Sequence, residues 1–108
     1  MKLMTKAIEK VLPALRSTIG VKTEDKVAVC KFFGGARYTF FVTEGSKMEN
    51  GDFEFFGYCK SNLGPDCDEW GNIRLSDLKS MKFPPFGLPI ERDLWWTPTK
   101  ISKILSDP

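Results

Sequence analysis

The sequence contains no histidine among its 108 residues. Histidine is the side chain whose charge changes near neutral pH, and it is the base of Ser-His-Asp and Cys-His nucleophilic sites and a common metal ligand. Its absence therefore excludes these nucleophilic mechanisms, histidine proton shuttles and histidine-ligated metals.

Cysteine is scarce, with only Cys30, Cys59 and Cys67 present. The spacing from Cys59 to Cys67 is not the short Cys-x-x-Cys pairing of a zinc site. An isolated cysteine behaves as a small hydrophobic residue. We therefore expect buried or half-buried thiols and no bound metal.

The sequence also lacks a signal-peptide pattern and any apolar run that approaches the length of a membrane span. An odd number of cysteines is typical of free thiols in a reducing compartment. We therefore expect a soluble, cytoplasmic protein with no membrane partner.

Excess charge of one sign is lacking as well, because 16 basic residues stand against 14 acidic ones, a formal net charge of +2. A dedicated DNA-binding domain usually carries a strong basic patch, so charge alone does not indicate nucleic acid. Gly34 and Gly35 form the only glycine pair, and no phosphate-cradling pattern follows them. We expect a hairpin turn there and no nucleotide cofactor.

Aromatic residues, in contrast, are abundant: nine Phe, three Trp and two Tyr. Apolar residues make up 42% and charged residues 28% of the chain, as in ordinary globular domains. The length is that of one domain, so we assign residues 1–108 to a single domain.

Hydrophobic periodicity and turn residues predict an α+β fold. Strands are expected at residues 27–33, 37–44 and 52–59, the last with a break at Gly57, and, as a short fourth strand, at Ile73 and Leu75. Helices are expected at residues 5–17, with a kink or a split at Pro13, directly after a cap at Ser76, and at residues 100–105. The expected architecture is an antiparallel meander of about four strands with short helices at the N-terminus, after the last strand and at the C-terminus.

The most distinctive segment carries three consecutive charges, Glu91, Arg92 and Asp93, after a proline-rich lead-in. In an extended chain Glu91 and Asp93 point to one face and Arg92 to the other. A structural role, in which Arg92 ties down a neighbouring segment, is favoured over a small polar binding site.

Aromatic residues also alternate with other types along the second predicted strand, with Tyr38 and Phe40 on one face and Arg37 and Phe41 on the other. An open aromatic face can stack nucleobases or receive a protein partner, whereas covered faces make the same residues core. The candidate binding residues are Arg37, Tyr38, Phe41, Trp95, Trp96, Glu91, Arg92 and Asp93.

Several blocks of the chain occur in the order of a known family. They are Lys-Phe-Phe at 31–33, Thr-Phe-Phe-Val-Thr-Glu at 39–44, Phe-Phe-Gly-Tyr at 55–58, Leu-Ser-Asp-Leu at 75–78 and, most specific, Gly-Leu-Pro-Ile-Glu-Arg-Asp-Leu at 87–94. In these the chain resembles a bacterial family of small proteins catalogued as a domain of unknown function. Where family members commonly have Pro-Glu-Leu-Gly, this chain has Asp-Glu-Trp-Gly at 68–71. The resemblance implies a setting on plasmids and other mobile elements, often near DNA-processing and antirestriction genes, and it implies no activity.

Three functions remain open at this point. The leading hypothesis is a non-enzymatic module that binds a protein partner in bacterial defence, counter-defence or element maintenance. The alternative is binding of single-stranded nucleic acid through Arg37, Tyr38, Phe41 and Lys31. The third is a Mg²⁺-dependent hydrolase that uses Glu44, Glu91 and Asp93. No catalytic residue and no cofactor is assigned, and the chain is expected not to be an enzyme.

Overall fold

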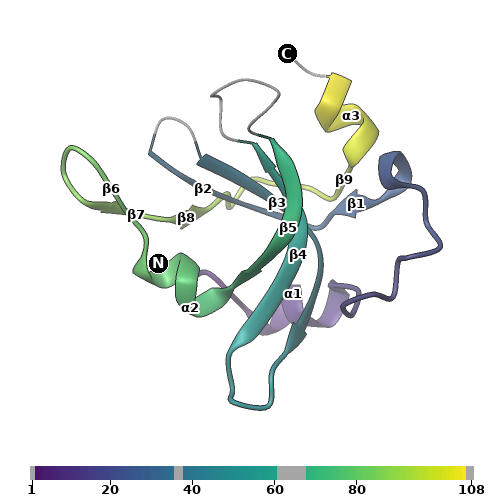
Figure 1. The fold of residues 1–108 in the computed structure, drawn as a ribbon, viewed down its shortest axis with the longest axis horizontal. Helices are drawn as coiled ribbons and strands as arrows, with labels where there is room; N and C mark the ends of the chain where they lie inside the picture. The colour runs from purple at the N-terminus through teal and green to yellow at the C-terminus, as the bar shows by residue number, and fades with distance from the viewer. Residues whose placement is uncertain (1, 36–37, 61–67, 107–108) are drawn as a thin grey trace.

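The computed structural model describes residues 2–35, 38–60 and 68–106. Its centre is a five-stranded antiparallel sheet with the strand order β5-β4-β3-β2-β8 (Figure 1). The strands are β2 (Cys30–Gly34), β3 (Tyr38–Lys47), β4 (Phe53–Lys60), β5 (Glu69–Arg74) and β8 (Glu91–Arg92). The predicted four-stranded meander is confirmed as β2 to β5, and β8 adds a fifth strand beside β2.

Two short strand pairs and four helical segments surround the sheet. The pairs are β1 (Val27–Ala28) with β9 (Thr99–Lys100), and β6 (Lys82–Phe83) with β7 (Leu88–Pro89). The helices are α1 (Lys6–Val11), the 3₁₀ helix η1 (Thr23–Asp25), α2 (Leu75–Ser80) and α3 (Ile101–Ser106). The α+β class and the three expected helix positions are thus confirmed. None of the helices described here is long and apolar enough to cross a membrane.

Helix α1 is shorter than predicted. Thr5 caps it as expected, since its Oγ1 accepts a hydrogen bond of 3.2 Å from Ile8 N. The helix ends at Val11, and Leu12 is already extended, with φ −76° and ψ 122°. A residue before proline is driven out of helical geometry, so Pro13 ends the helix rather than kinking it.

The irregularity of the sheet lies in β3 and not at Gly57, where a break was predicted. Strand β4 alternates without interruption, whereas the β3–β4 register shifts between Val42 and Glu44. Gly57 serves a different purpose, because a Cβ there would lie 2.0 Å from the backbone oxygen of Phe41. Close backbone approach therefore requires glycine at this position.

Two further sequence expectations need correction. The first predicted strand divides into β1 and β2, because β1 pairs with β9 while β2 pairs with β3. Ser76 does not cap α2, whose N-cap is Arg74. The backbone N–H and the hydroxyl of Ser76 instead donate to the carboxylate of Asp52, at 3.2 and 2.6 Å.

The sheet carries helices on both faces. On the α1/α2 face lies the larger core cluster, which consists of Leu3, Leu12, Cys30, Phe32, Phe40, Val42, Phe53, Phe55, Leu78 and Ile90. On the α3 face lies a smaller cluster of Ala28, Phe41, Ile101 and Ile104, against which Tyr58, Trp70 and Trp96 pack half-buried. The buried aromatic residues of these clusters are Phe32, Phe40, Phe41, Phe53 and Phe55. Half-buried ones pack on both faces, Tyr38 and Phe83 on the α1/α2 face and Tyr58, Trp70 and Trp96 on the α3 face.

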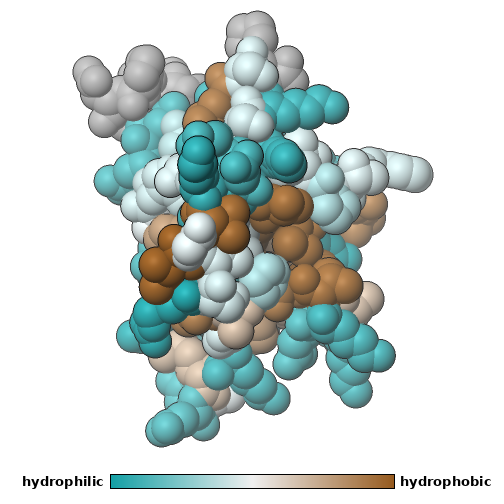
Figure 2. Space-filling view, turned by 90° about the vertical axis from the view of Figure 1, so that its right-hand side faces the viewer, coloured by the Kyte–Doolittle hydropathy of each residue, from teal (hydrophilic) through white to brown (hydrophobic). Residues whose placement is uncertain are grey.

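The segment between α1 and β1 runs along one side of the molecule (Figure 1). Its exposed apolar side chains are Ile19 and Val21, and the neighbouring Val11 and Val27 are exposed too. Figure 2 shows hydrophobic side chains across the middle of this side, with hydrophilic ones above and below. This side of the molecule is therefore partly apolar.

Candidate functional site

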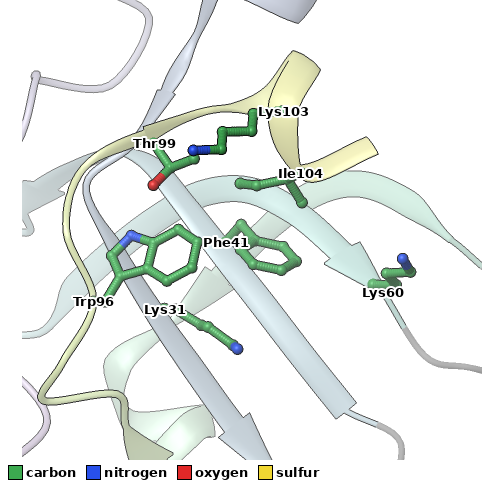
Figure 3. Close-up of a pocket in the computed structure, with 7 residues that line it drawn as sticks. All are labelled: Lys31, Phe41, Lys60, Trp96, Thr99, Lys103 and Ile104. Atoms are coloured by element: carbon green, nitrogen blue, oxygen red, sulfur yellow. The ribbon is translucent and has the colours of Figure 1, made fainter. Parts of the chain in front are cut away.

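A pocket of about 390 Å³ opens on the α3 face (Figure 3). Its walls come from three parts of the chain that are distant in sequence. The sheet supplies Lys31, Phe41 and Lys60, the segment before α3 supplies Trp96 and Thr99, and α3 supplies Lys103 and Ile104. We call these seven residues the lysine–aromatic pocket.

The floor of the lysine–aromatic pocket is a pair of aromatic rings. The centroids of Phe41 and Trp96 lie 5.6 Å apart, with an angle of 47° between the ring planes. Trp96 is fixed by two hydrogen bonds: its Nε1 donates to the oxygen of Ala28 at 3.0 Å, and its backbone N–H to the oxygen of Asp93 at 3.4 Å. The indole is therefore held in place and only half-buried.

Lys31 connects the floor to the edge of the sheet. Its amine lies 5.8 Å from the ring centroid of Phe41 and 5.6 Å from that of Trp96. An ammonium over an aromatic face is attracted by the ring quadrupole. The same amine is 3.9 Å from Oδ2 of Asp93, so one carboxylate and two rings determine its position.

Two more lysines complete the pocket. Figure 3 shows the side chains of Lys31, Lys60 and Lys103 on different sides of the two rings, with Lys60 beyond Phe41. The lining residues include three lysines and no carboxylate. A lysine carries a positive charge and three donors. The pocket therefore offers positive charge beside a flat apolar floor, which suits a ligand with both an anionic and a planar part.

The aromatic floor continues across the sheet. Tyr58 is the cross-strand neighbour of Phe41, and Trp70 is that of Tyr58. The centroid of Trp70 lies 5.5 Å from those of both Tyr58 and Phe56. Trp96, Phe41, Tyr58, Trp70 and Phe56 are thus successive neighbours that run from β3 to β5 and back to β4, and we call them the aromatic row.

The predicted aromatic and basic residues are not all brought together. Phe41 and Trp96 meet in the lysine–aromatic pocket, next to Lys31. Tyr38 lies on the α1/α2 face and packs against Phe83, with ring centroids 6.0 Å apart. Burial, followed by the neighbouring Cys59, raises the pKa of the Tyr38 phenol. Arg37 lies outside the described residues.

The Glu91-Arg92-Asp93 segment has the expected orientation of its charges. Glu91 is opposite Phe33 and Arg92 is opposite Phe32 in the β2–β8 register, so neighbouring charges face opposite sides. Nη1 of Arg92 donates to the oxygen of Leu3 at 3.2 Å and so ties the N-terminal segment to β8.

Asp93 organises the turn that leads to the pocket. Its Oδ1 accepts a hydrogen bond from Trp95 N at 2.9 Å, and its own N–H donates to the oxygen of Lys31 at 2.9 Å. The ring of Trp95 does not line the pocket and is 92% exposed. The charged segment thus positions Trp96 and Lys31 instead of forming a separate polar site.

Glu44, a predicted metal ligand, has another task. Its carboxylate is 3% exposed and accepts hydrogen bonds from Arg16 N at 2.7 Å, from Thr18 N at 3.2 Å and from the Thr18 hydroxyl, and Lys26 lies 3.9 Å away. Burial opposes ionisation, but the hydrogen bonds and Lys26 outweigh it and lower the pKa of Glu44. We call this arrangement the Glu44 latch.

The described residues contain no group of three or more Cys, Asp or Glu side chains that is placed to hold a metal ion. Cys30 is a buried free thiol whose pKa is raised to about 12 by burial, an effect that Arg92 opposes. Cys59 is a half-buried free thiol, and Cys67 lies outside the described residues.

Sequence reasoning missed Lys60 and Lys103, and no local signal marks them. Lys60 is the last residue of β4 and Lys103 lies within α3, and only the fold brings both within one pocket. The approach of β9 to β1 was the missing information, since this pairing places α3 over Phe41.

Comparison with known proteins identifies the family but no activity. The family model described as "Protein of unknown function (DUF2958)" matches residues 3–106, nearly the whole chain. No curated protein and no solved structure matches. The chain therefore belongs to the DUF2958 family of proteins of unknown function.

Proposed function

We propose that the chain is a binding module for single-stranded nucleic acid and that the lysine–aromatic pocket is its principal contact. The observation that carries this proposal is the placement of Lys31, Lys60 and Lys103 around the Phe41–Trp96 floor. Proteins that bind single strands combine a basic groove for the phosphates with aromatic rings for the bases.

The size of the pocket and its charge support the same function. Small-ligand pockets measure about 300–1,000 Å³, so a pocket of about 390 Å³ suits one unit of a polymer rather than a large cofactor. Because the chain as a whole carries only +2, the case for nucleic acid depends on the three lysines of this pocket and not on the overall charge. A local basic site beside an aromatic row fits a short single strand better than a long duplex backbone.

A fluorescence-anisotropy titration with a labelled oligothymidylate at low salt tests the proposal. The wild type should bind, and its affinity should fall steeply as salt is added because phosphate contacts release counterions. Lys103→Ala should weaken binding several-fold and reduce the salt dependence by about one unit of log–log slope. Lys79→Ala removes the same charge from an exposed site on α2 and should leave both unchanged.

Absence of binding at tens of micromolar protein would overturn the proposal. If Lys103→Ala and Lys79→Ala lost the same amount of affinity, the pocket would not be the principal contact, because Lys103 would then contribute no more than any other surface charge. Thermal unfolding of each variant shows whether a loss of binding reflects a loss of fold.

A second candidate function is binding of a protein partner, which is favoured by a different observation. The Trp95 ring is 92% exposed, and Leu94 beside it is 61% exposed. Trp is among the residues that concentrate binding energy at protein interfaces. A stoichiometric partner captured from a host lysate by the wild type but not by Trp95→Ala would support this function, and equal capture by both would count against it.

A Mg²⁺-dependent hydrolase gains no support, because both oxygens of Glu44 are already engaged in the Glu44 latch. The wider setting stays part of the proposal. The family resemblance implies a bacterial mobile element, and the free thiols Cys30 and Cys59 fit a reducing cytoplasm. Single strands are intermediates of the DNA processing that the genetic neighbourhood of the family implies.

A further inference from the structure

A second hollow of about 380 Å³ lies on the α3 face at the other end of the aromatic row. Its lining includes Arg16, Lys26, Phe56, Asn72 and one carboxylate, that of Glu44. Phe56 is also the last member of the aromatic row, and its ring stacks on Trp70 with an angle of 23° between planes. Neighbouring aromatic rings therefore connect this hollow, which we call the Arg16 hollow, with the lysine–aromatic pocket.

The backbone of Arg16 adopts a conformation that only glycine takes without cost. Its φ is +66°, and it is the one non-glycine residue in the described ranges with a positive φ. Strained residues persist only where their surroundings enforce them, and they concentrate at ligand-binding and functional sites. This conformation therefore requires an explanation beyond the folding of the segment.

Strand β3 enforces that conformation through three hydrogen bonds to the segment around Arg16. Glu44 Oε1 accepts a hydrogen bond from Arg16 N at 2.7 Å, and Ser46 Oγ accepts one from Leu15 N at 3.0 Å. The N–H of Gly45 donates to the oxygen of Pro13 at 2.9 Å. The bulged part of β3 thus holds the backbone of Arg16 in a fixed place at the edge of the hollow.

The guanidinium of Arg16 remains available to a ligand. Arg16 is exposed, and no carboxylate in the described ranges forms an ion pair with it. The charge of Glu44 is offset by Lys26 and by the donors of the Glu44 latch. A guanidinium presents a planar fork of donors that matches the geometry of a phosphate.

The two sites are close enough for one short strand. In the β3–β4 register Phe41 is opposite Tyr58, and Phe56 lies two residues before Tyr58 in β4, on the same face. Strands lie about 4.8 Å apart and rise about 3.4 Å per residue, which puts the Cα atoms of Phe41 and Phe56 roughly 8 Å apart. Sheet faces with aromatic residues hold two or three stacked bases of a single strand.

We propose that the Arg16 hollow is a second contact site for the same single strand, in which the Arg16 guanidinium binds a backbone phosphate beside Phe56. This inference rests on the proposed function. It adds a direction, because the bound nucleic acid would run over the sheet face from the lysine–aromatic pocket towards Phe56 and the segment that follows α1.

The test compares Arg16→Gly, Arg16→Lys and Lys22→Ala with the wild type. Affinity is measured by anisotropy against a labelled oligothymidylate of about ten nucleotides, within the site sizes of single-strand binders. Arg16→Gly should bind about five times more weakly or worse, with a salt slope lower by about one. Arg16→Lys retains the positive charge, so the dependence of its affinity on salt concentration should match that of the wild type. Lys22→Ala, which removes one exposed charge from the same segment, should bind like the wild type.

Thermal unfolding separates binding from folding in this series. Glycine adopts a positive φ without the clash of a Cβ, so Arg16→Gly should melt at the wild-type temperature or higher. A protein that is equally stable and binds more weakly has lost a contact and not its fold. Unchanged or higher stability together with weaker binding is expected when a residue that is held in a strained conformation for its function is replaced.

The outcomes distinguish this inference from the function on which it rests. A wild type that binds no oligonucleotide overturns both. A wild type that binds, with Arg16→Gly matching it in affinity and slope, overturns the Arg16 hollow alone and leaves the lysine–aromatic pocket in place. An equal loss in Lys22→Ala and Arg16→Gly also overturns it, because any charge on that segment would then suffice.

Discussion

Lys31 and Asp93 form an ion pair across the β2–β8 edge, with 3.9 Å between Nζ and Oδ2. The pair joins the most distinctive segment of the sequence to the lysine–aromatic pocket, because the Lys31 amine also lies over Phe41 and Trp96. Both side chains are about a quarter exposed, at 28% and 25%. The Asp93 carboxylate and a phosphate of the ligand would therefore compete for the same Lys31 amine.

Replacement of Asp93 by Asn should therefore strengthen oligonucleotide binding. The Asn oxygen can still accept the hydrogen bond from Trp95 N, so the turn is kept while the charge is lost. Exposed ion pairs are worth about 0–1 kcal/mol, which corresponds to a gain in affinity of up to about fivefold. Anisotropy titrations at two or more salt concentrations provide the measurement.

Glu91→Gln is the matched control for Asp93→Asn. It removes the same charge from the same extended segment and face, but among the described residues the ion pair of Lys31 is with Asp93 and not with Glu91. A gain that appears in both variants would show a general charge effect and contradict the competition. Weaker binding by Asp93→Asn alone would show that the carboxylate itself positions Trp96.

The sequence predicts the sheet well because its signals are local. Alternation along β3 separates Phe40 from Phe41, and the structure places these two rings in different clusters. The same alternation turns Arg92 towards the oxygen of Leu3 and Asp93 to the other side, next to Lys31. These patterns depend only on the period of two in an extended chain.

The candidate site is less predictable, since it depends on contacts between distant segments. Lys103 joins the pocket only because β9 pairs with β1 and carries α3 onto Phe41. Tyr38 does not join the pocket because it is three positions from Phe41 on β3, and residues an odd number of positions apart in a strand face opposite sides of the sheet. The Glu44 latch joins residues 28 apart in sequence, and nothing near Glu44 indicates its partners.

The Glu44 latch should make stability depend on pH. The pKa of Glu44 is lower in the folded protein than its ordinary value, so its ionised form stabilises the fold above the ordinary range, near pH 4.3. That stabilisation is lost as the pH falls through the lowered folded value. Urea unfolding between pH 3 and 7, expressed as the free energy of unfolding, should show the decline.

Glu44→Gln identifies the group responsible for that decline. The amide places donors against the N–H and hydroxyl of Thr18, so the variant should lose about 1.5–3 kcal/mol at neutral pH, as expected for hydrogen bonds to a charged group. Its stability should fall less between pH 5 and 3 than that of the wild type. Asp52, whose pKa is also lowered, chiefly by the hydrogen bond from Ser76, contributes equally to both proteins and cancels in the comparison. Parallel curves would exclude Glu44 as the titrating group.

The two described cysteines should differ in reactivity. The thiolate is the reactive form, and burial, opposed by Arg92, raises the pKa of Cys30 to about 12. Cys59 is only half-buried, although burial and then Glu69 and Asp68 raise its pKa as well. In a titration with a disulfide reagent at pH 8, Cys59→Ser should remove a reactive thiol and Cys30→Ser should not. Labelling of Cys30 in the native protein would contradict its burial.

Gly57 provides the sharpest test of the sheet itself. A Cβ at this position would meet the carbonyl oxygen of Phe41 at 2.0 Å, and backbone in the middle of β3 cannot move aside as a flexible side chain can. Gly57→Ala should therefore lower the free energy of unfolding by about 1–3 kcal/mol or more, the usual cost of overpacking.

Gly71, the cross-strand partner of Gly57 on β5, has no atom within 4 Å of the position where a Cβ would lie. Gly71→Ala should unfold like the wild type, and because Phe41 forms the floor of the lysine–aromatic pocket, only Gly57→Ala should also weaken oligonucleotide binding. Equal stability of the two variants would mean that β3 and β4 do not approach each other as closely at this point.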